Sequence, residues 1–326
     1  MRRTVLTVFA ACSVVLFVDA GMAEAEDISG TIVFTKTIYE DSRLVGDVIC
    51  ELTATPCIDF GASHIKLRLN GFTMTGPADP DNASSPNSCP SAQPPSADGI
   101  RILDQTHAQI LGPGMVQKFR RHGILIDGTP GISTKAKVKL VTSHHNCFSG
   151  LLTLGMSDSV IEENVSVRNA SNSGFSPCGG NCIVNSHNNR IRRNHFAGNG
   201  AIAPGPAHGY VGSNDFGVGL IGNSSGNVIE ENSIGGNMNG VLIQANAADN
   251  VIRRNVIAGN PPSQVSRDSG PLVGFDVKDE SPAAGSGSRN TFKQNWCVTY
   301  SGPGPAVCPS FPGPGGDDDD DDGSDD

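Results

Sequence analysis

The sequence has few aromatic residues, few charged residues and, after its first 18 positions, no long apolar run. Aromatic side chains make up 5% of the 326 residues, with a single Trp, so platforms for stacking against sugars or bases are scarce. No sustained helical periodicity links the apolar positions, and the segments between them are crowded with Gly, Asn and Ser. These features exclude a helical repeat protein. No CxxC pair is present, so the usual zinc spacing is absent.

Negative charge is concentrated at the C-terminal end. The formal net charge is -10, and eight aspartates at positions 317–322, 325 and 326 supply most of it. Without them the net charge is about -2, which gives no electrostatic support for nucleic-acid binding. A Pro/Gly-rich stretch precedes the aspartates, so we expect residues 301–326 to be a disordered linker and acidic tail.

The N-terminal 25 residues are typical of a secretory signal peptide. Arg2 and Arg3 precede an apolar run from Val5 to Val18, and small residues suited to cleavage follow up to Ala25. The run is shorter than the roughly 20 residues that span a bilayer. We therefore expect a secreted or periplasmic protein with no stable membrane insertion after the signal is cleaved.

Eight cysteines remain once Cys12 of the signal is removed, an even number that favours disulfides in an oxidising compartment. A metal site is the rival interpretation, and spacing alone leaves the connectivity open. Short separations favour three pairs, which leave a fourth across a longer loop. These pairs are Cys50 with Cys57, Cys178 with Cys182, Cys297 with Cys308, and Cys89 with Cys147.

A phrase in which Asn stands three places after an apolar residue recurs along the chain, as in "VIEEN" and "RIRRN". Its minimum spacing of 23 residues fits one coil of a parallel β-solenoid with loops inserted at some corners. We predict one all-β domain of about eight or nine coils over residues 26–300. Asn is expected at the corners, where it tolerates left-handed backbone and its amide bonds neighbouring coils. The apolar anchors are Ile110, Val138, Ile161, Ile191, Ile229, Ile252 and Phe292.

The two residues before the repeated Asn alternate in charge from coil to coil. They read Glu162-Glu163, Arg192-Arg193, Glu230-Glu231 and Arg253-Arg254, followed by Lys293-Gln294. Strands in adjacent coils stack about 4.8 Å apart, so like charges in equivalent positions would repel. The alternation therefore has a structural explanation, which we favour over a role in binding substrate.

Two longer stretches resemble a known family. These are "IKLRLNGFTMTGP" at 65–77 and "QILGPGMVQKFRRHGILID" at 109–127. With the later repeats, they resemble secreted bacterial right-handed parallel β-helix proteins of the pectate-lyase-like superfold. The chain is also similar to the repeat domain of the periplasmic copper-binding maturation protein of nitrous oxide reductase. The resemblance implies the fold, while Arg68 stands where these proteins commonly have Asp.

Basic residues are predicted to form a strip along one edge of the solenoid. Aligning "HGILI", "SGLLT" and "NGVLI" as equivalent strand starts places the basic residues in three successive coils. Arg would pair the carboxylates of an anionic sugar chain, and His or Lys would take a ring proton. Ordinary solvent-facing turn residues are the alternative. The candidate catalytic residues are His122, His144, His145 and Lys118, and the candidate substrate-binding residues are Arg120, Arg121 and Arg168.

Acidic residues in the insertions complete the candidate site. Asp215 and Asp276 are predicted to bind substrate, because glycan-processing sites often need converging carboxylates. No cofactor is expected, although the spacing of Asp79, Asp81 and Asn82 leaves calcium open. His144 and His145 would share a metal ion only if the chain bends between them.

The predicted function is an exported protein that binds or processes an anionic polysaccharide or cell-envelope glycan along one edge. If it is an enzyme, a polysaccharide lyase or epimerase is favoured over a hydrolase. A non-catalytic envelope or adhesion protein is the first alternative, and a periplasmic metal-handling protein is the second.

Overall fold

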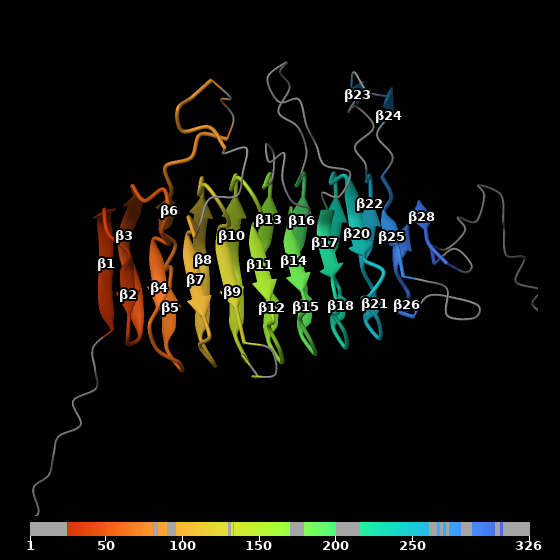
Figure 1. Cartoon of the computed structure of the whole chain (residues 1–326), viewed down its shortest axis with the longest axis horizontal. Coiled ribbons are helices and arrows are strands. Elements are labelled where there is room, and N and C mark those ends of the chain that lie inside the picture. Colours follow the sequence, from red (N-terminus) through yellow and green to blue (C-terminus); the bar gives the residue numbers. More distant parts are fainter. Residues whose placement is uncertain are drawn as a thin grey trace, which may run out of the picture.

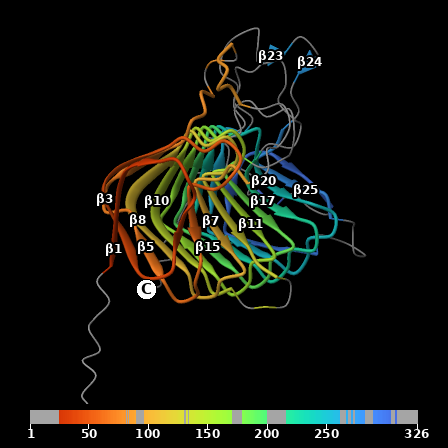
Figure 2. The same cartoon turned by 60° about the vertical axis from the view of Figure 1, so that its left-hand side comes forward.

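The structure is a computed structural model that describes residues 25–80, 82, 84–89, 96–129, 132, 134–169, 179–199, 216–260, 266–267, 270–271, 274–281, 289–303 and 307–308. Within these residues the chain forms strands and turns and no helix, so the predicted all-β class is confirmed. Accordingly, no helix able to cross a membrane is found in them. Figure 1 shows the strands stacked along one rod, and the turned view in Figure 2 shows its coils as a tube.

One sheet contributes a single strand to each coil. Its ten strands pair in parallel, so the solenoid has ten coils where eight or nine were expected. The difference lies at the N-terminus, where the first coils lack the Asn repeat that marks the others. In order along the rod, the strands are β2 (Lys36–Ile38), β4 (Ile58–Phe60), β7 (Ile100–Leu103), β9 (Ile124–Asp127), β11 (Leu151–Leu154), β14 (Asn181–Val184), β17 (Phe216–Ile221), β20 (Asn239–Ile243), β25 (Val277–Asp279) and β28 (Tyr300–Ser301).

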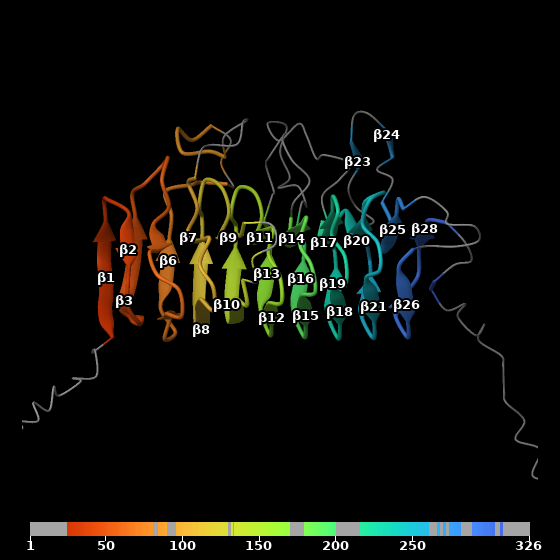
Figure 3. The ribbon, with the colours of Figure 1, turned by 60° about the horizontal axis from the view of Figure 1, so that its bottom comes forward.

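The 16-stranded sheet bends into two limbs. Four long strands run through both limbs: β1 (Glu26–Ile32), β3 (Ser42–Cys50), β8 (Gln109–Gln117) and β10 (Lys137–His144). Elsewhere the first limb contains β5 (Lys66–Arg68), β12 (Val160–Glu162), β15 (Arg190–Arg192), β18 (Val228–Glu230), β21 (Val251–Arg253) and β26 (Thr291–Lys293). The second limb contains β6 (Thr73–Thr75), β13 (Val165–Val167), β16 (His195–Ala197), β19 (Ser233–Gly235), β22 (Val256–Ala258) and β27 (Trp296–Cys297). In Figure 3 the second-limb strands β13, β16 and β19 lie above the first-limb strands β12, β15 and β18.

Each coil thus has three corners. Corner 1 lies between the limbs, corner 2 between the second limb and the ten-stranded sheet, and corner 3 between that sheet and the next coil. Beyond the rod's upper edge in Figure 1, a short antiparallel pair forms from β23 (Ser266–Arg267) and β24 (Gly270–Pro271).

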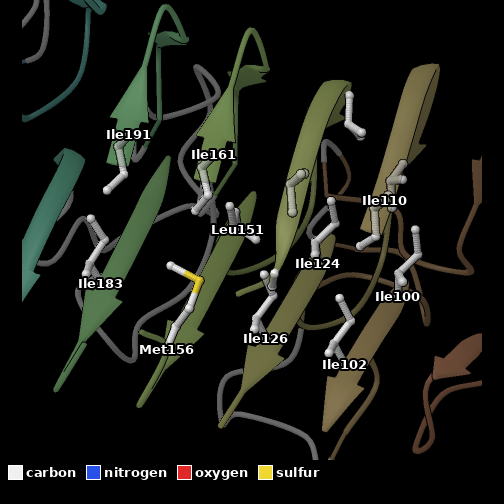
Figure 4. Close-up of a cluster of buried hydrophobic side chains, with 14 of the residues drawn as sticks. Ile100, Ile102, Ile110, Ile124, Ile126, Leu151, Met156, Ile161, Ile183 and Ile191 are labelled. Carbon is white, nitrogen blue, oxygen red and sulfur yellow. The ribbon is translucent and has the colours of Figure 1, made fainter. Parts of the chain in front are cut away.

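The predicted apolar anchors form one interior column. Ile161 pairs with Ile191, Ile191 with Ile229, and Ile229 with Ile252. These four side chains are at most 1% exposed. Figure 4 shows Ile161 and Ile191 among the buried aliphatic side chains of neighbouring coils. Burial of this continuous aliphatic interior is the main source of stability, because a single coil has no core of its own.

Buried asparagines form a hydrogen-bond ladder at each of the three corners. At corner 1 the backbone N–H and the side-chain Nδ2 of Asn194 both donate to Asn232 Oδ1, at 2.9 and 3.0 Å. The same Nδ2 donates to the Ile161 carbonyl of the preceding coil at 3.0 Å. The ladders contain Asn164, Asn194, Asn232, Asn255 and Asn295 at corner 1, Asn146, Asn169, Asn199, Asn237 and Asn260 at corner 2, and Asn189, Asn227, Asn250 and Asn290 at corner 3.

The left-handed residue at corner 1 is not the asparagine, contrary to one reason given for Asn in the repeat. Glu163, Arg193, Glu231 and Arg254 have φ angles of 59°, 52°, 57° and 54°, and each directly precedes a ladder Asn. Asn is therefore required for its amide, which satisfies buried backbone groups in two coils at once.

Three disulfides join the pairs that the spacing favoured: Cys50–Cys57, Cys89–Cys147 and Cys297–Cys308. Cys182 is also disulfide-bonded. Its predicted partner, Cys178, lies outside the described residues.

Candidate functional site

Three members of the predicted basic strip occupy one column at corner 2. Lys118, His145 and Arg168 hold the same position in three consecutive coils, directly after paired strand residues. Each has a left-handed backbone, with φ of 57°, 51° and 53°. The backbone N–H of Lys118 donates to the His144 carbonyl of the next coil at 3.3 Å. We call these three residues the corner column.

The corner column ends where glycine takes over the position. Gly198, Gly236 and Gly259 follow in later coils, with φ between 61° and 71°. Glycine is the residue that adopts this backbone at least cost, so long side chains here are a departure from the local preference. Within the column Arg168 is exposed, whereas His145 is only 8% exposed.

Arg121 forms an ion pair with a buried carboxylate, Asp98, which was not among the predicted site residues. Its Nη1 lies 3.1 Å from Asp98 Oδ2, and Asp98 is 0% exposed. Burial raises the pKa of Asp98 to about 6, against the opposing effect of Arg121 and of the His122 N–H. The sequence does contain a pattern that places Asp98 beside His122 in the next coil, because "DGI" at 98–100 aligns with "HGI" at 122–124. Arg120, the third arginine of the strip, is half-buried.

His122 is not the surface base that was predicted. The side chain is 2% exposed, and its Nδ1 accepts a hydrogen bond from the Ser149 N–H at 3.1 Å. Its backbone N–H donates to Asp98 Oδ1 at 3.2 Å. Burial and the nearby Arg121 hold the pKa of His122 well below its usual value. His122 is therefore a neutral acceptor within the corner, because its strand start turns the ring inward.

Described residues of the segment inserted between β6 and β7 pack over this part of corner 2. Cys89 of the insertion is bonded to Cys147, and Ala78 and Phe148 pack beside that disulfide. The Ala78 N–H donates to the Lys118 carbonyl at 2.8 Å. This contact covers the backbone of the first coil of the corner column.

His144 and His145 meet because the chain bends between them. Their Nδ1 atoms are 2.8 Å apart and their rings are nearly perpendicular, at 85°. The positive φ of His145 turns its side chain toward the side chain of His144. The bend required for shared metal binding is thus present, and in this structure the two nitrogens hydrogen-bond each other.

Asp276, the acidic candidate that the structure describes, lies at the end of the corner 2 ladder. Asp276 is 1% exposed and ends the corner 2 ladder, since its Oδ1 accepts from Asn260 Nδ2 at 3.0 Å. Its Oδ2 accepts from the backbone N–H groups of Val298 and Thr299, at 2.8 and 3.1 Å. Both carboxylate oxygens of Asp276 thus hold the last coils together, and substrate binding by Asp276 stays a prediction. Asp215 lies outside the described residues.

The calcium spacing also has a local explanation in part. Asn82 Oδ1 accepts from the Ser84 N–H at 3.2 Å, and the Asn82 N–H donates to the Asp79 carbonyl. These bonds form a turn, and Asp81 lies outside the described residues. Across the part of the chain that the structure describes, no three His, Cys, Asp or Glu side chains gather as metal ligands.

A second charged surface covers the outside of the first limb. Arg192 Nη2 lies 2.6 Å from Glu162 Oε2, and Arg253 Nη2 lies 2.7 Å from Glu230 Oε2. Burial would raise the pKa of Glu162, but hydrogen bonds from Lys137 and Arg192 outweigh it and hold that pKa at about 2. Glu230 is held at about 2 in the same way. Ion pairs between coils therefore accompany the predicted charge alternation.

A family model described as a right handed beta helix region matches residues 115–304. No curated protein matches the sequence.

Solved structures with the same fold include phage and bacterial proteins. The Dettilon tailspike protein is 13% identical, with 82% of this chain and 53% of that chain covered and a TM-score of 0.51. Tailspike protein 2 of Escherichia coli O157:H7 bacteriophage CAB120 is 12% identical over 82% of this chain and 38% of its own, with a TM-score of 0.45. The Azotobacter vinelandii mannuronan C-5 epimerase A-module is 14% identical over 83% and 78%, with a TM-score of 0.43. The chain thus spans about half or less of the two tailspikes.

Proposed function

Because this chain belongs to the family with a right handed beta helix region, which matches more than half of it, we propose that it is an exported protein that binds an anionic polysaccharide. The binding edge is corner 2, where the corner column places half-buried Lys118 and exposed Arg168 on either side of buried His145. The observation that carries the proposal is the stacking of Lys118, His145 and Arg168 at one position. Coils repeat about every 4.8 Å, so this edge matches a ligand that is itself a linear repeat.

Export and an anionic ligand are both supported by the chemistry of the chain. Three described disulfides fit an oxidising compartment. Arg168 is exposed at the edge and suits carboxylate or sulfate groups.

Binding without catalysis is favoured by the state of one predicted catalytic residue, His122, and of two predicted substrate-binding residues, Arg121 and Asp276. His122 is buried and neutral, Arg121 is paired with Asp98, and Asp276 caps a ladder. General acid–base chemistry requires a group within hydrogen-bond reach of the substrate proton. A glycan-binding role in the cell envelope, including adhesion, follows from the same observation.

The test is affinity electrophoresis and calorimetry of the mature protein with acidic polysaccharides, with dextran as the neutral control. Arg168→Gln combined with Lys118→Gln is expected to weaken binding about tenfold. Arg43→Gln is the matched control, because Arg43 is a surface cation of the N-terminal coils and pairs with Asp27. If no acidic polymer binds, or if both variants bind like the parent, the proposal is wrong. Unsaturated sugar products, detected by the absorbance used to follow polysaccharide lyases, would instead show that the protein is an enzyme.

A further inference from the structure

From β10 to β26, cations outnumber carboxylates on the outer face of the first limb, and charge pairing between coils does not explain the excess. Four carboxylates, Glu162, Glu163, Glu230 and Glu231, lie in this network. Eight cations lie on the same face: Lys137, Lys139, Arg190, Arg192, Arg193, Arg253, Arg254 and Lys293. Alternation alone would need equal numbers to cancel repulsion. We call this surface the charge ladder.

The excess charge is presented to solvent because the central carboxylates are buried under their partners. The side chains of Glu162 and Glu230 are 3% and 1% exposed, whereas those of Arg190 and Arg254 are 46% and 47% exposed. Glu162 alone contacts Lys137, Lys139, Arg192 and Arg193. A buried carboxylate saturated in this way organises the cations above it, and their outer N–H groups remain available to a ligand.

From Lys139 to Arg253, cationic positions recur in every second coil, and Lys293 then follows Arg253 in the adjacent coil. At one strand position, the residues that pair from coil to coil are, in order, Lys139, Glu162, Arg192, Glu230 and Arg253. With coils about 4.8 Å apart, the cationic coils are separated by about 10 Å. The neighbouring corner 3 does not cancel this pattern, because exposed Lys135 and Arg289 there balance Asp158 and Asp249.

The coil between two cationic coils carries an exposed carboxylate. Glu231 is 38% exposed and lies between Arg193 and Arg254, at 3.9 and 3.0 Å from their guanidinium nitrogens. An anionic group placed over Arg193 or Arg254 is attracted, and one placed over Glu231 is repelled. Repulsion at the intermediate position is a device for rejecting the wrong ligand.

We propose that the charge ladder is a second binding track, selective for linear anionic polysaccharides that carry one charge on every second sugar. A sugar unit of an extended chain is about as long as one coil spacing. Its charged units would lie on Arg193 and Arg254, and its neutral unit on Glu231. A polymer charged on every sugar would place a carboxylate against Glu231. This inference rests on the proposed function, which it extends to a second face and a defined charge pattern.

The experiment compares hyaluronan, with one carboxylate per disaccharide, against polygalacturonate, with one per sugar, by calorimetry at low and physiological salt. The parent protein is expected to bind hyaluronan about tenfold more tightly than polygalacturonate. Arg193→Gln with Arg254→Gln should weaken hyaluronan binding about tenfold. Glu163, Glu162 and Glu230 remain held by Lys139, Arg192 and Arg253. Glu231 loses both of its partners, so a thermal melt verifies folding of the variant.

Glu231→Gln provides a gain of binding that a purely structural ladder does not predict. Removing the intermediate negative charge should raise affinity for polygalacturonate several-fold and leave affinity for hyaluronan nearly unchanged. Arg43→Gln, which changes a surface cation of the N-terminal coils that pairs with Asp27, is the control and should leave the preference between the two polymers unaltered. If polymers bind without preference and Glu231→Gln changes nothing, the charge-pattern inference is wrong while the proposed function stands. If no anionic polymer binds, the proposed function itself fails.

Discussion

Arg192 donates to Glu162 of the preceding coil through two nitrogens, Nη2 and Nε, at 2.6 and 3.0 Å from Oε2. The two residues face each other because Ile161 and Ile191 pair directly beneath them in the interior column. Apolar register inside the solenoid and charge register outside it are therefore the same register, read from opposite faces of one strand pair.

Acid should weaken the charge ladder. Glu162 and Glu230 have folded pKa values of about 2, below their usual 4.5, so the unfolded chain takes up protons first as pH falls. Their contribution to stability is present above pH 4.5 and is lost as pH falls from about 4.5 toward 2, at up to about 3 kcal/mol each. Urea unfolding at pH 5 and pH 3 measures the loss. Glu162→Gln should reduce the difference between these two pH values, and an unchanged difference would contradict the assignment.

Asp98 should have the opposite pH dependence. Its pKa is raised from 3.8 to about 6, so the folded state binds the proton more tightly than the unfolded state. Stability from this group is fully present below pH 3.8 and is lost as pH rises through 6, by about 3 kcal/mol. Asp98→Asn removes the titration, so the free energy of unfolding of the variant should lack this decline between pH 4 and 7. Equal slopes for parent and variant would show that Asp98 titrates normally.

Replacing an asparagine in the middle of a ladder should lower the free energy of unfolding more than replacing an exposed asparagine. Asn232 accepts from two nitrogens of Asn194 and donates Nδ2 to Asn255 Oδ1 and to the Ile191 carbonyl. Asn232→Ala leaves these buried groups without partners, at a cost of about 2 to 4 kcal/mol. Asn223→Ala is the control, because that side chain is exposed. Chemical denaturation compares the two variants, and equal small effects would count against a stabilising ladder.

One interior position should be improved by an apolar residue. Asn181 is 0% exposed and stands in a column with Leu151 and Val218. Neither polar atom of its amide has a hydrogen-bond partner within the described chain. Asn181→Val should raise the free energy of unfolding by about 1 to 3 kcal/mol, because it removes an unsatisfied buried amide. A destabilised variant in thermal and denaturant unfolding would imply that the amide is satisfied in solution.

Asp276 should matter for stability and not for ligand affinity. Asp276→Ala removes acceptors for Asn260 and for two backbone N–H groups, and should cost about 3 kcal/mol. Asp276→Asn retains the Oδ1 acceptor for the ladder and should cost less. Polysaccharide affinity, measured where both variants are folded, should equal that of the parent. A loss of affinity at full folding would restore Asp276 to the binding site.

Sequence reasoning succeeded where one side chain position predicts its neighbour in the next coil. The column through Ile161, Ile191, Ile229 and Ile252 and the alternating charges follow from spacing. The three described disulfides join cysteines that the spacing favoured, although it left other pairings open. It missed the two ladders at corners 2 and 3, because their asparagines are spread over less regular phrases. It also placed the left-handed residue one position late, at Asn instead of Glu163 or Arg193.

By itself, then, the sequence determined the solenoid, because a stacked coil repeats its contacts at a fixed interval and leaves a periodic pattern in the chain. Only the tertiary structure decided which polar residues face solvent. His and Asp are residue types common in catalytic sites. His122 and Asp276 are nevertheless buried, and both form hydrogen bonds with residues of other coils. Burial at a corner depends on how the inserted segments and the adjacent coils pack, and that packing has no period in the sequence.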